Sequence, residues 1–79
     1  MKIHWLECGG LTIIAEQQVS GWLTIITGLG ESYKAPCTDE ETAKNAGVEG
    51  AKAILRRLEI PIPECLTDPK WISSSLNAN

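Results

Sequence analysis

Residues 38–59 read TDEETAKNAGVEGAKAILRRLE, and the hydrophobic period of the chain changes where this stretch begins. Within it, apolar and small residues recur every three to four positions, which is the spacing of one face of an α-helix. Thr38 has the chemistry of an N-cap, and Glu41 completes the capping-box pattern Thr-x-x-Glu. Pro61 cannot continue a helix. We therefore predict a helix over about residues 39–59.

Before Thr38 the pattern is that of a β-sheet. Apolar residues alternate with polar ones, and β-branched residues are frequent. Gly9-Gly10 and Ser20-Gly21 are two-residue turn signals, because glycine accepts the positive φ that tight hairpin turns require. Pro36 lacks a backbone donor, so it ends the last strand or marks a sheet edge. The predicted antiparallel strands cover about residues 2–8, 11–18, 22–27 and 32–36.

The C-terminal part of the chain predicts a second, short helix. Asp68 suits an N-cap and Pro69 suits the first helical position, so we expect this helix over about residues 69–76. The full length of 79 residues is that of one small domain, residues 1–79. The predicted fold class is α+β: a three- to four-stranded antiparallel meander, one main helix on one face, and the short C-terminal helix.

The two glycine turns also predict which side chains share a sheet face. A turn at Gly9-Gly10 places Cys8 opposite Leu11, and a turn at Ser20-Gly21 places Val19 opposite Trp22. Side chains alternate between the faces along each strand. The first face then carries Leu6, Cys8, Leu11, Ile13, Ala15, Val19, Trp22 and Ile26. We expect the main helix to cover this face.

A second apolar face is left over. Its large apolar residues are Ile3, Trp5, Ile14, Leu23 and Ile25, with Glu7 and Glu16 at the rim. Because one helix covers one face, this surplus indicates an interaction surface. Three occupants fit the pattern: the C-terminal segment with Trp71, Ile72 and Leu76, a second copy of the chain, or a separate protein.

Small residues dominate the predicted buried stripe of the main helix. That stripe consists of Ala43, Ala46, Gly47, Gly50, Ala51, Ile54 and Leu58. Each glycine inside a helix costs about 1 kcal/mol relative to alanine. We therefore expect Gly47 and Gly50 to allow close approach of the helix backbone to the sheet.

The net charge disfavours phosphate binding, and the cysteine content bears on the cellular compartment. The net charge of −3 has the wrong sign for an ordinary phosphate binder. The first residues do not resemble a signal peptide, and no apolar run is long enough to cross a bilayer. The three cysteines are an odd number. We therefore expect reduced thiols in a cytoplasmic protein with no membrane segment.

No catalytic or metal-binding pattern stands out. His4, Cys8, Cys37 and Cys65 match the ligand number of a zinc site, but none of the cysteines are spaced as Cys-x2-Cys. A Cys8–His4 nucleophile pair has no evident orienting residue. Residues 28–31 contain a lone Gly-x-Gly, which suits a hairpin loop. We expect no enzyme activity, no metal and no cofactor.

The predicted function is that of a small protein-protein interaction module that acts by occupying a surface. The candidate contact residues are those of the second face. In size and composition the chain is similar to inhibitors of host machinery encoded by phages and mobile elements, including anti-CRISPR proteins. The alternative is a nucleic-acid-binding module that uses Lys52, Arg56 and Arg57, which the acidic net charge disfavours.

Overall fold

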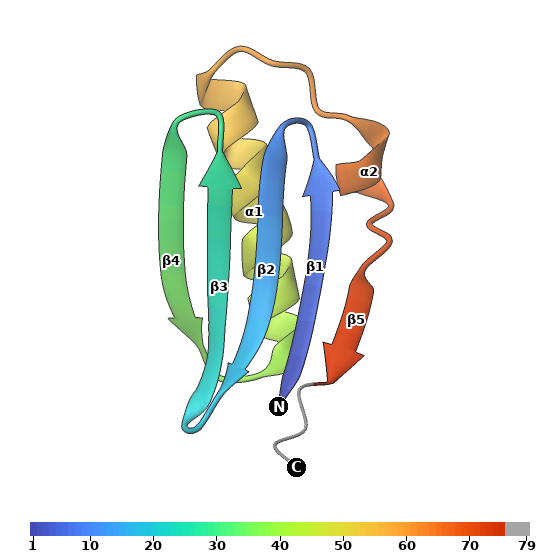
Figure 1. Ribbon diagram of the computed structural model, residues 1–79. Helices are drawn as coiled ribbons and strands as arrows, with labels where there is room; N and C mark the ends of the chain where they lie inside the picture. The colour runs from blue at the N-terminus through green and yellow to red at the C-terminus, as the bar shows by residue number, and fades with distance from the viewer. Residues whose placement is uncertain (76–79) are drawn as a thin grey trace.

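The structure, a computed structural model, describes residues 1–75 (Figure 1). Over these residues the chain forms one antiparallel sheet with the strand order β4-β3-β2-β1-β5, and two helices. The predicted α+β class and antiparallel meander are confirmed. The strands are β1 (Lys2–Cys8), β2 (Leu11–Gln18), β3 (Gly21–Gly28), β4 (Glu31–Cys37) and β5 (Ile72–Ser75).

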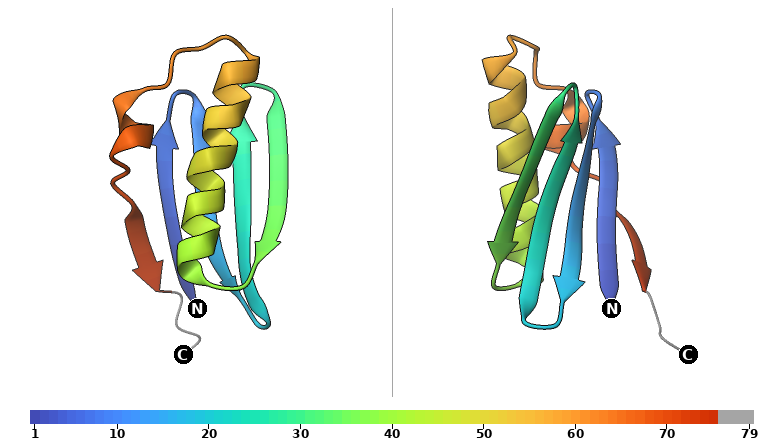
Figure 2. Two further views of the ribbon diagram at one scale, coloured as in Figure 1. Left: turned by 180° about the vertical axis from the view of Figure 1, so that it is seen from behind. Right: turned by 60° about the vertical axis from the view of Figure 1, so that its left-hand side comes forward.

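The main helix, α1 (Glu40–Arg57), lies across one face of the sheet, and no described element lies on the other face (Figure 2). Its N-cap is Asp39 and not the predicted Thr38. The Asp39 carboxylate accepts a hydrogen bond of 2.8 Å from the backbone N–H of Thr42. An aspartate in extended conformation satisfies a free N–H of the first turn as well as threonine does, and this shifts the start of the helix by one residue.

The core lies between α1 and the sheet, where the two layers come unusually close. A Cβ on Gly47 would lie 2.6 Å from Cγ2 of Ile13, and one on Gly50 would lie 2.8 Å from Cδ1 of Ile26. The predicted reason for these helix glycines, close approach to the sheet, is confirmed. The buried helix residues are Ala43, Gly47, Val48, Ala51, Ile54 and Leu55.

The predicted helix stripe is wrong at its C-terminal end. Leu58 is 39% exposed, because it is the C-cap and lies after the last turn of α1. Leu55 is fully buried instead, with its side chain against the β1–β2 turn at Gly9. Val48 is buried on the side of the helix that faces Leu66 and Trp71.

The first predicted turn is confirmed and the second is displaced. Cys8 pairs with Leu11 across Gly9-Gly10 as expected. The second turn is Val19-Ser20, because Gly21 belongs to β3, where its φ of 147° disfavours any side chain. The pairing of β2 with β3 is therefore shifted by two residues from the predicted register. Because side chains alternate with a period of two, a shift of two residues leaves each strand residue on its predicted face. Val19 is the exception: it was expected in the core and is 92% exposed.

The C-terminal segment differs most from the prediction. In place of a helix over residues 69–76, the chain forms α2 (Glu64–Thr67), an irregular link, and β5. Asp68 ends α2 and does not begin a helix. β5 pairs with β1, with Lys2 opposite Ser75 and Trp5 opposite Ile72, because the free edge of β1 offers backbone partners to a short serine-rich segment. The expected contact of Leu76 lies outside the described residues.

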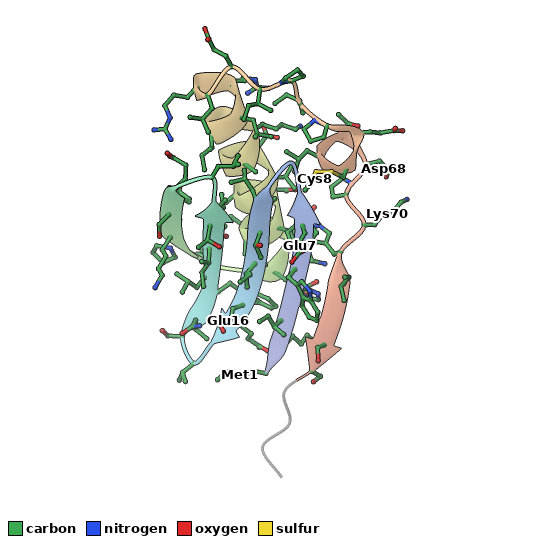
Figure 3. The ribbon with its side chains drawn as sticks, turned by 45° about the horizontal axis from the view of Figure 1, so that its top comes forward. Met1, Glu7, Cys8, Glu16, Asp68 and Lys70 are labelled. Carbon is green, nitrogen blue, oxygen red and sulfur yellow. A yellow bond between two sulfur atoms is a disulfide. The ribbon has the colours of Figure 1, made fainter. Side chains whose placement is uncertain are left out.

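A disulfide between Cys8 and Cys65 ties α2 to the end of β1 (Figure 3). Their Cα atoms are 6.0 Å apart although the residues are 57 positions apart in sequence. The prediction of reduced thiols is therefore wrong for Cys8 and Cys65, and Cys37 alone among the cysteines is free. Disulfides persist in oxidising compartments, so the argument for a cytoplasmic location loses its basis. Among residues 1–75, neither helix has the length and apolar character to span a bilayer.

Candidate interaction surface

The sheet face that points away from α1 is the main candidate site. Its strand register places five side chains in one row across the sheet, because directly paired residues lie on the same face. This central row consists of Ile72, Trp5, Ile14, Ile25 and Lys34. Four of its members are apolar, so a continuous apolar band runs from β5 to β3. We call this face, with its neighbouring rows, the open face.

The two neighbouring rows differ in character. Toward the β1–β2 turn the row is polar and consists of Glu7, Thr12, Thr27 and Ser32. Toward the β2–β3 turn the row is mixed and consists of Ser74, Ile3, Glu16, Leu23 and Pro36. The apolar area is therefore bounded on one side and continues on the other, as in the core and rim of a protein interface.

Each predicted contact residue lies on this face. The five apolar residues, Ile3, Trp5, Ile14, Leu23 and Ile25, are all half-buried by their neighbours in the sheet. Ile72, which the sequence reading assigned to a covering helix, adds a sixth and is 54% exposed. The structure thus brings the predicted residues together and enlarges the set by one.

The charged residues of the open face lie on three different strands. Figure 3 shows Glu7 on β1 and Glu16 on β2, toward opposite ends of the strands. Glu7 is exposed, whereas Glu16 is half-buried and accepts a hydrogen bond of 2.6 Å from Nε2 of Gln18. Lys34 is exposed on β4 at the other end of the central row. The acids lie on β1 and β2, and the base lies on the edge strand.

A pocket adjoins the open face beside Trp5. Its volume is about 610 Å³, and it lies between β1 and the segment from α2 to β5. Asp68 and Lys70 form an ion pair of 3.0 Å at its border. The lining residues are Trp5, Leu6, Glu7, Glu64, Cys65, Asp68, Lys70 and Ile72. No local sequence pattern predicts this pocket, because its walls depend on the disulfide and on β5.

One of the three expected occupants of the open face is excluded for the described residues. The segment up to Ser75 does not fold over this face; it extends the sheet at its edge as β5. Trp71 lies on the opposite side, against the core beneath α1, where Lys44 Nζ is 5.8 Å from its ring centroid. The open face therefore has no cover within residues 1–75.

The basic residues of the alternative hypothesis are largely paired. Lys52 Nζ lies 3.2 Å from a carboxylate oxygen of Glu49, and Arg57 forms an ion pair with Glu31 of β4. Arg56 is exposed in the last turn of α1. Carboxylates beside two of the three cations reduce the positive potential that nucleic-acid binding requires.

The residues considered for thiol and metal chemistry are dispersed. Cys8 and Cys65 are bonded to each other, so Cys8 has no thiol to pair with His4 as a nucleophile. Cys37 lies on β4 with its sulfur 3.6 Å from Oγ1 of Thr24. His4 contacts Ser73 and Glu40, two residues that the sequence reading did not connect with it.

Comparison with family models, curated proteins and solved structures finds no match for this chain.

Proposed function

We propose that the protein binds another protein through the open face and acts by covering a surface of that partner. The observation that supports this proposal is the apolar central row, which four strands of the sheet expose and no described residue covers. A contiguous exposed apolar patch of this kind marks interaction sites in soluble proteins. This mode of action is the one expected of an inhibitor, such as those that phages and mobile elements direct at host machinery.

Trp5 is the proposed anchor of the interface. It lies inside the central row, between Ile14 and Ile72, and borders the 610 Å³ pocket. Tryptophan is enriched among the residues that dominate binding energy, especially where a pocket surrounds the contact. A partner side chain that enters this pocket would contact Trp5, which lines it.

The charges of the open face indicate the chemistry of the partner. Glu7 and Glu16 flank the apolar band on β1 and β2, and the chain carries a net charge of −3. Electrostatic complementarity favours basic groups on the partner opposite these acids. The matching surface is therefore an apolar patch with lysine or arginine opposite Glu7 and Glu16 and a carboxylate opposite Lys34.

The test compares variants of the open face with a matched control. Trp5→Lys and Ile25→Lys place a charge in the central row, whereas Val19→Lys alters an equally apolar residue in the exposed β2–β3 turn. A partner captured by the wild-type chain is purified, and its affinity for each variant is measured by calorimetry. We expect Trp5→Lys to weaken binding at least about 30-fold and Val19→Lys to leave it unchanged.

Two results would contradict the proposal that the open face binds a separate protein. Equal affinity of the partner for wild type and Trp5→Lys, with both folded by circular dichroism, would exclude the open face as the interface. Light scattering over a dilution series tests the alternative occupant, a second copy. A dimer that Ile25→Lys converts to a monomer would show that the open face serves self-association.

A further inference from the structure

Three polar side chains from distant parts of the chain meet beside the first residues of β1. Nδ1 of His4 lies 2.6 Å from Oγ of Ser73, which comes from β5. Nε2 of His4 lies 3.0 Å from Oε1 of Glu40, the first residue of α1. A hydroxyl, an imidazole and a carboxylate are thus joined in series by two hydrogen bonds.

The chemistry of the carboxylate fixes the direction of both hydrogen bonds. An ionised glutamate can only accept hydrogen bonds, so Nε2 of His4 is protonated and donates a hydrogen bond to Glu40. In the neutral imidazole, Nδ1 then holds a lone pair and accepts a hydrogen bond from the hydroxyl of Ser73. The pKa of Glu40 is lowered by the hydrogen bond from His4, with smaller contributions from the charges of His4, Lys44 and Lys2. The carboxylate therefore stays ionised at neutral pH.

Packing holds the imidazole and the carboxylate in place. His4 is 7% exposed and its ring stacks on that of Trp22, with centroids 5.8 Å apart and planes 11° from parallel. The second carboxylate oxygen of Glu40 lies 3.6 Å from Nζ of Lys44. A base whose ring is fixed by packing and whose tautomer is fixed by a carboxylate is the arrangement that activates a serine hydroxyl.

Access differs between the nucleophile and the base. Ser73 is exposed on β5, whereas His4 is buried. Both border a pocket of about 350 Å³, to which Lys2 and Glu40 also contribute. A substrate of this size can reach the hydroxyl, while the sheet and α1 screen the base from bulk water. Lys2 also lines this pocket, where a lysine side chain would offer a positive charge to a developing oxyanion.

We propose that Ser73, His4 and Glu40 form a nucleophilic site that hydrolyses small esters. Ser73 is the nucleophile, His4 is the general base, and Glu40 is the positioning residue. The site lies at the β5 edge on the α1 side of the sheet, so it does not depend on the function proposed for the open face. The proposal departs from the sequence-based expectation of no enzyme activity, because only the fold brings His4, Glu40 and Ser73 together.

The reaction consists of two balanced acyl transfers. Oγ of Ser73 attacks the carbonyl carbon of the ester and its proton passes to Nδ1 of His4. The oxyanion collapses, the alcohol leaves with the proton from His4, and the acyl group stays on Ser73. Water then attacks the acyl carbon by the same proton path, and the acid leaves as the Ser73 hydroxyl reforms. One ester and one water give one acid and one alcohol, with no change of oxidation state.

The first test is covalent labelling of the native chain. An alkyl fluorophosphonate reacts with an activated serine by forming an O–P bond and releasing fluoride. We expect one phosphonyl group per chain, located on Ser73 by peptide mass spectrometry, and no modification of Ser20, an exposed serine in the β2–β3 turn. Labelling should disappear in urea, because unfolding separates Ser73 from His4.

The second test measures hydrolysis of p-nitrophenyl acetate by the variants. His4→Gln should lower the rate at least about 100-fold, the usual contribution of a general base, and Ser73→Ala should lower it to the background rate. Glu40→Gln should lower kcat and leave KM unchanged, which a merely structural role would not produce. Ser20→Ala, in the exposed β2–β3 turn, is the control with unchanged rate.

A native chain that acquires no phosphonyl group on Ser73, or acquires it equally in urea, would overturn the proposal. The three residues would then serve only to fasten β5 and α1 to β1. Circular dichroism of each variant separates a loss of activity from a loss of fold.

Discussion

The two faces of the sheet are built from the same strands but differ in what covers them. On β3, Ile26 points toward α1 and is fully buried, whereas its neighbour Ile25 points away and stays half-exposed. Both are isoleucines in the same strand, so composition does not separate the faces. A sheet with one helical layer can bury one apolar face, and the other has to find its partner elsewhere. The covered face therefore has its packing partner within the described residues, whereas the open face lacks one there.

The sharpest test of this comparison is truncation of the two neighbouring isoleucines. Ile26→Ala should lower the free energy of unfolding by about 4 kcal/mol, because it leaves a cavity under α1 next to Gly50. Ile25→Ala should lower it by about 1 kcal/mol, since only cross-strand contacts are lost. Urea denaturation measures both values. Equal losses would show that the open face is also core.

The disulfide joins the two regions, since Cys8 lies in the covered face and Cys65 borders the pocket beside Trp5. Cys65→Ala should lower the free energy of unfolding by about 3 kcal/mol, because the bond closes a long loop in the unfolded chain. Cys37→Ala, which leaves the disulfide intact, is the control. Thermal denaturation with and without reductant checks the result. An unchanged stability after reduction would contradict the structural role of this bond.

Two threonines of β3, one on each face of the sheet, form a matched pair whose substitution should have smaller effects on stability. Oγ1 of Thr24 donates a hydrogen bond of 2.7 Å to the carbonyl of Ala43 in α1 and is fully buried, whereas Thr27 is exposed in the polar row of the open face. Thr24→Val should lower the free energy of unfolding by about 1.5 kcal/mol. Thr27→Val should leave it unchanged. If the two substitutions cost the same, the bond to Ala43 contributes nothing.

The smallest effect concerns acid stability of the covering helix. The pKa of Glu40 lies below its ordinary value of 4.5, mainly because His4 donates a hydrogen bond to the carboxylate. A carboxyl with a lowered pKa stabilises the fold above pH 4.5, and this contribution is lost as the pH falls through the folded value. Glu40 is partly exposed, so solvent screening keeps the effect small. Glu40→Gln should flatten the stability profile between pH 5 and 3 in urea melts, and a parallel profile would assign acid sensitivity to other groups.

The local parts of the fold could be predicted because their causes are local. The Gly9-Gly10 turn fixed the pairing of Cys8 with Leu11, and residue alternation then assigned Trp5 and Ile14 to the open face. Gly47 and Gly50 predict a helix close to the sheet from the helix sequence alone. Each of these inferences uses residues within one hairpin or one helix.

The remaining features depend on residues far apart in sequence. Gly21 looked like a turn residue, yet a Cβ there would lie 2.9 Å from the carbonyl oxygen of Cys37, so it serves close approach of β4. The bond from Cys8 to Cys65 and the contacts of His4 with Ser73 and Glu40 have no local signature. β5 was missed for the same reason, since its strand conformation comes from pairing with β1.

The pairing of β5 with β1 also bears on how the sheet forms and opens. Lys2 faces Ser75, so in the reduced chain this pairing closes a loop that contains nearly all of the described residues, whereas each other pair of neighbouring strands is joined by a tight turn. Loop closure of that length is slow and entropically costly. In the reduced chain β5 should therefore be the last strand to join the sheet and the first to leave it. The Cys8–Cys65 bond links β1 to the segment just before β5, so in the oxidised chain it replaces that long loop by a short one and prolongs the pairing at this edge.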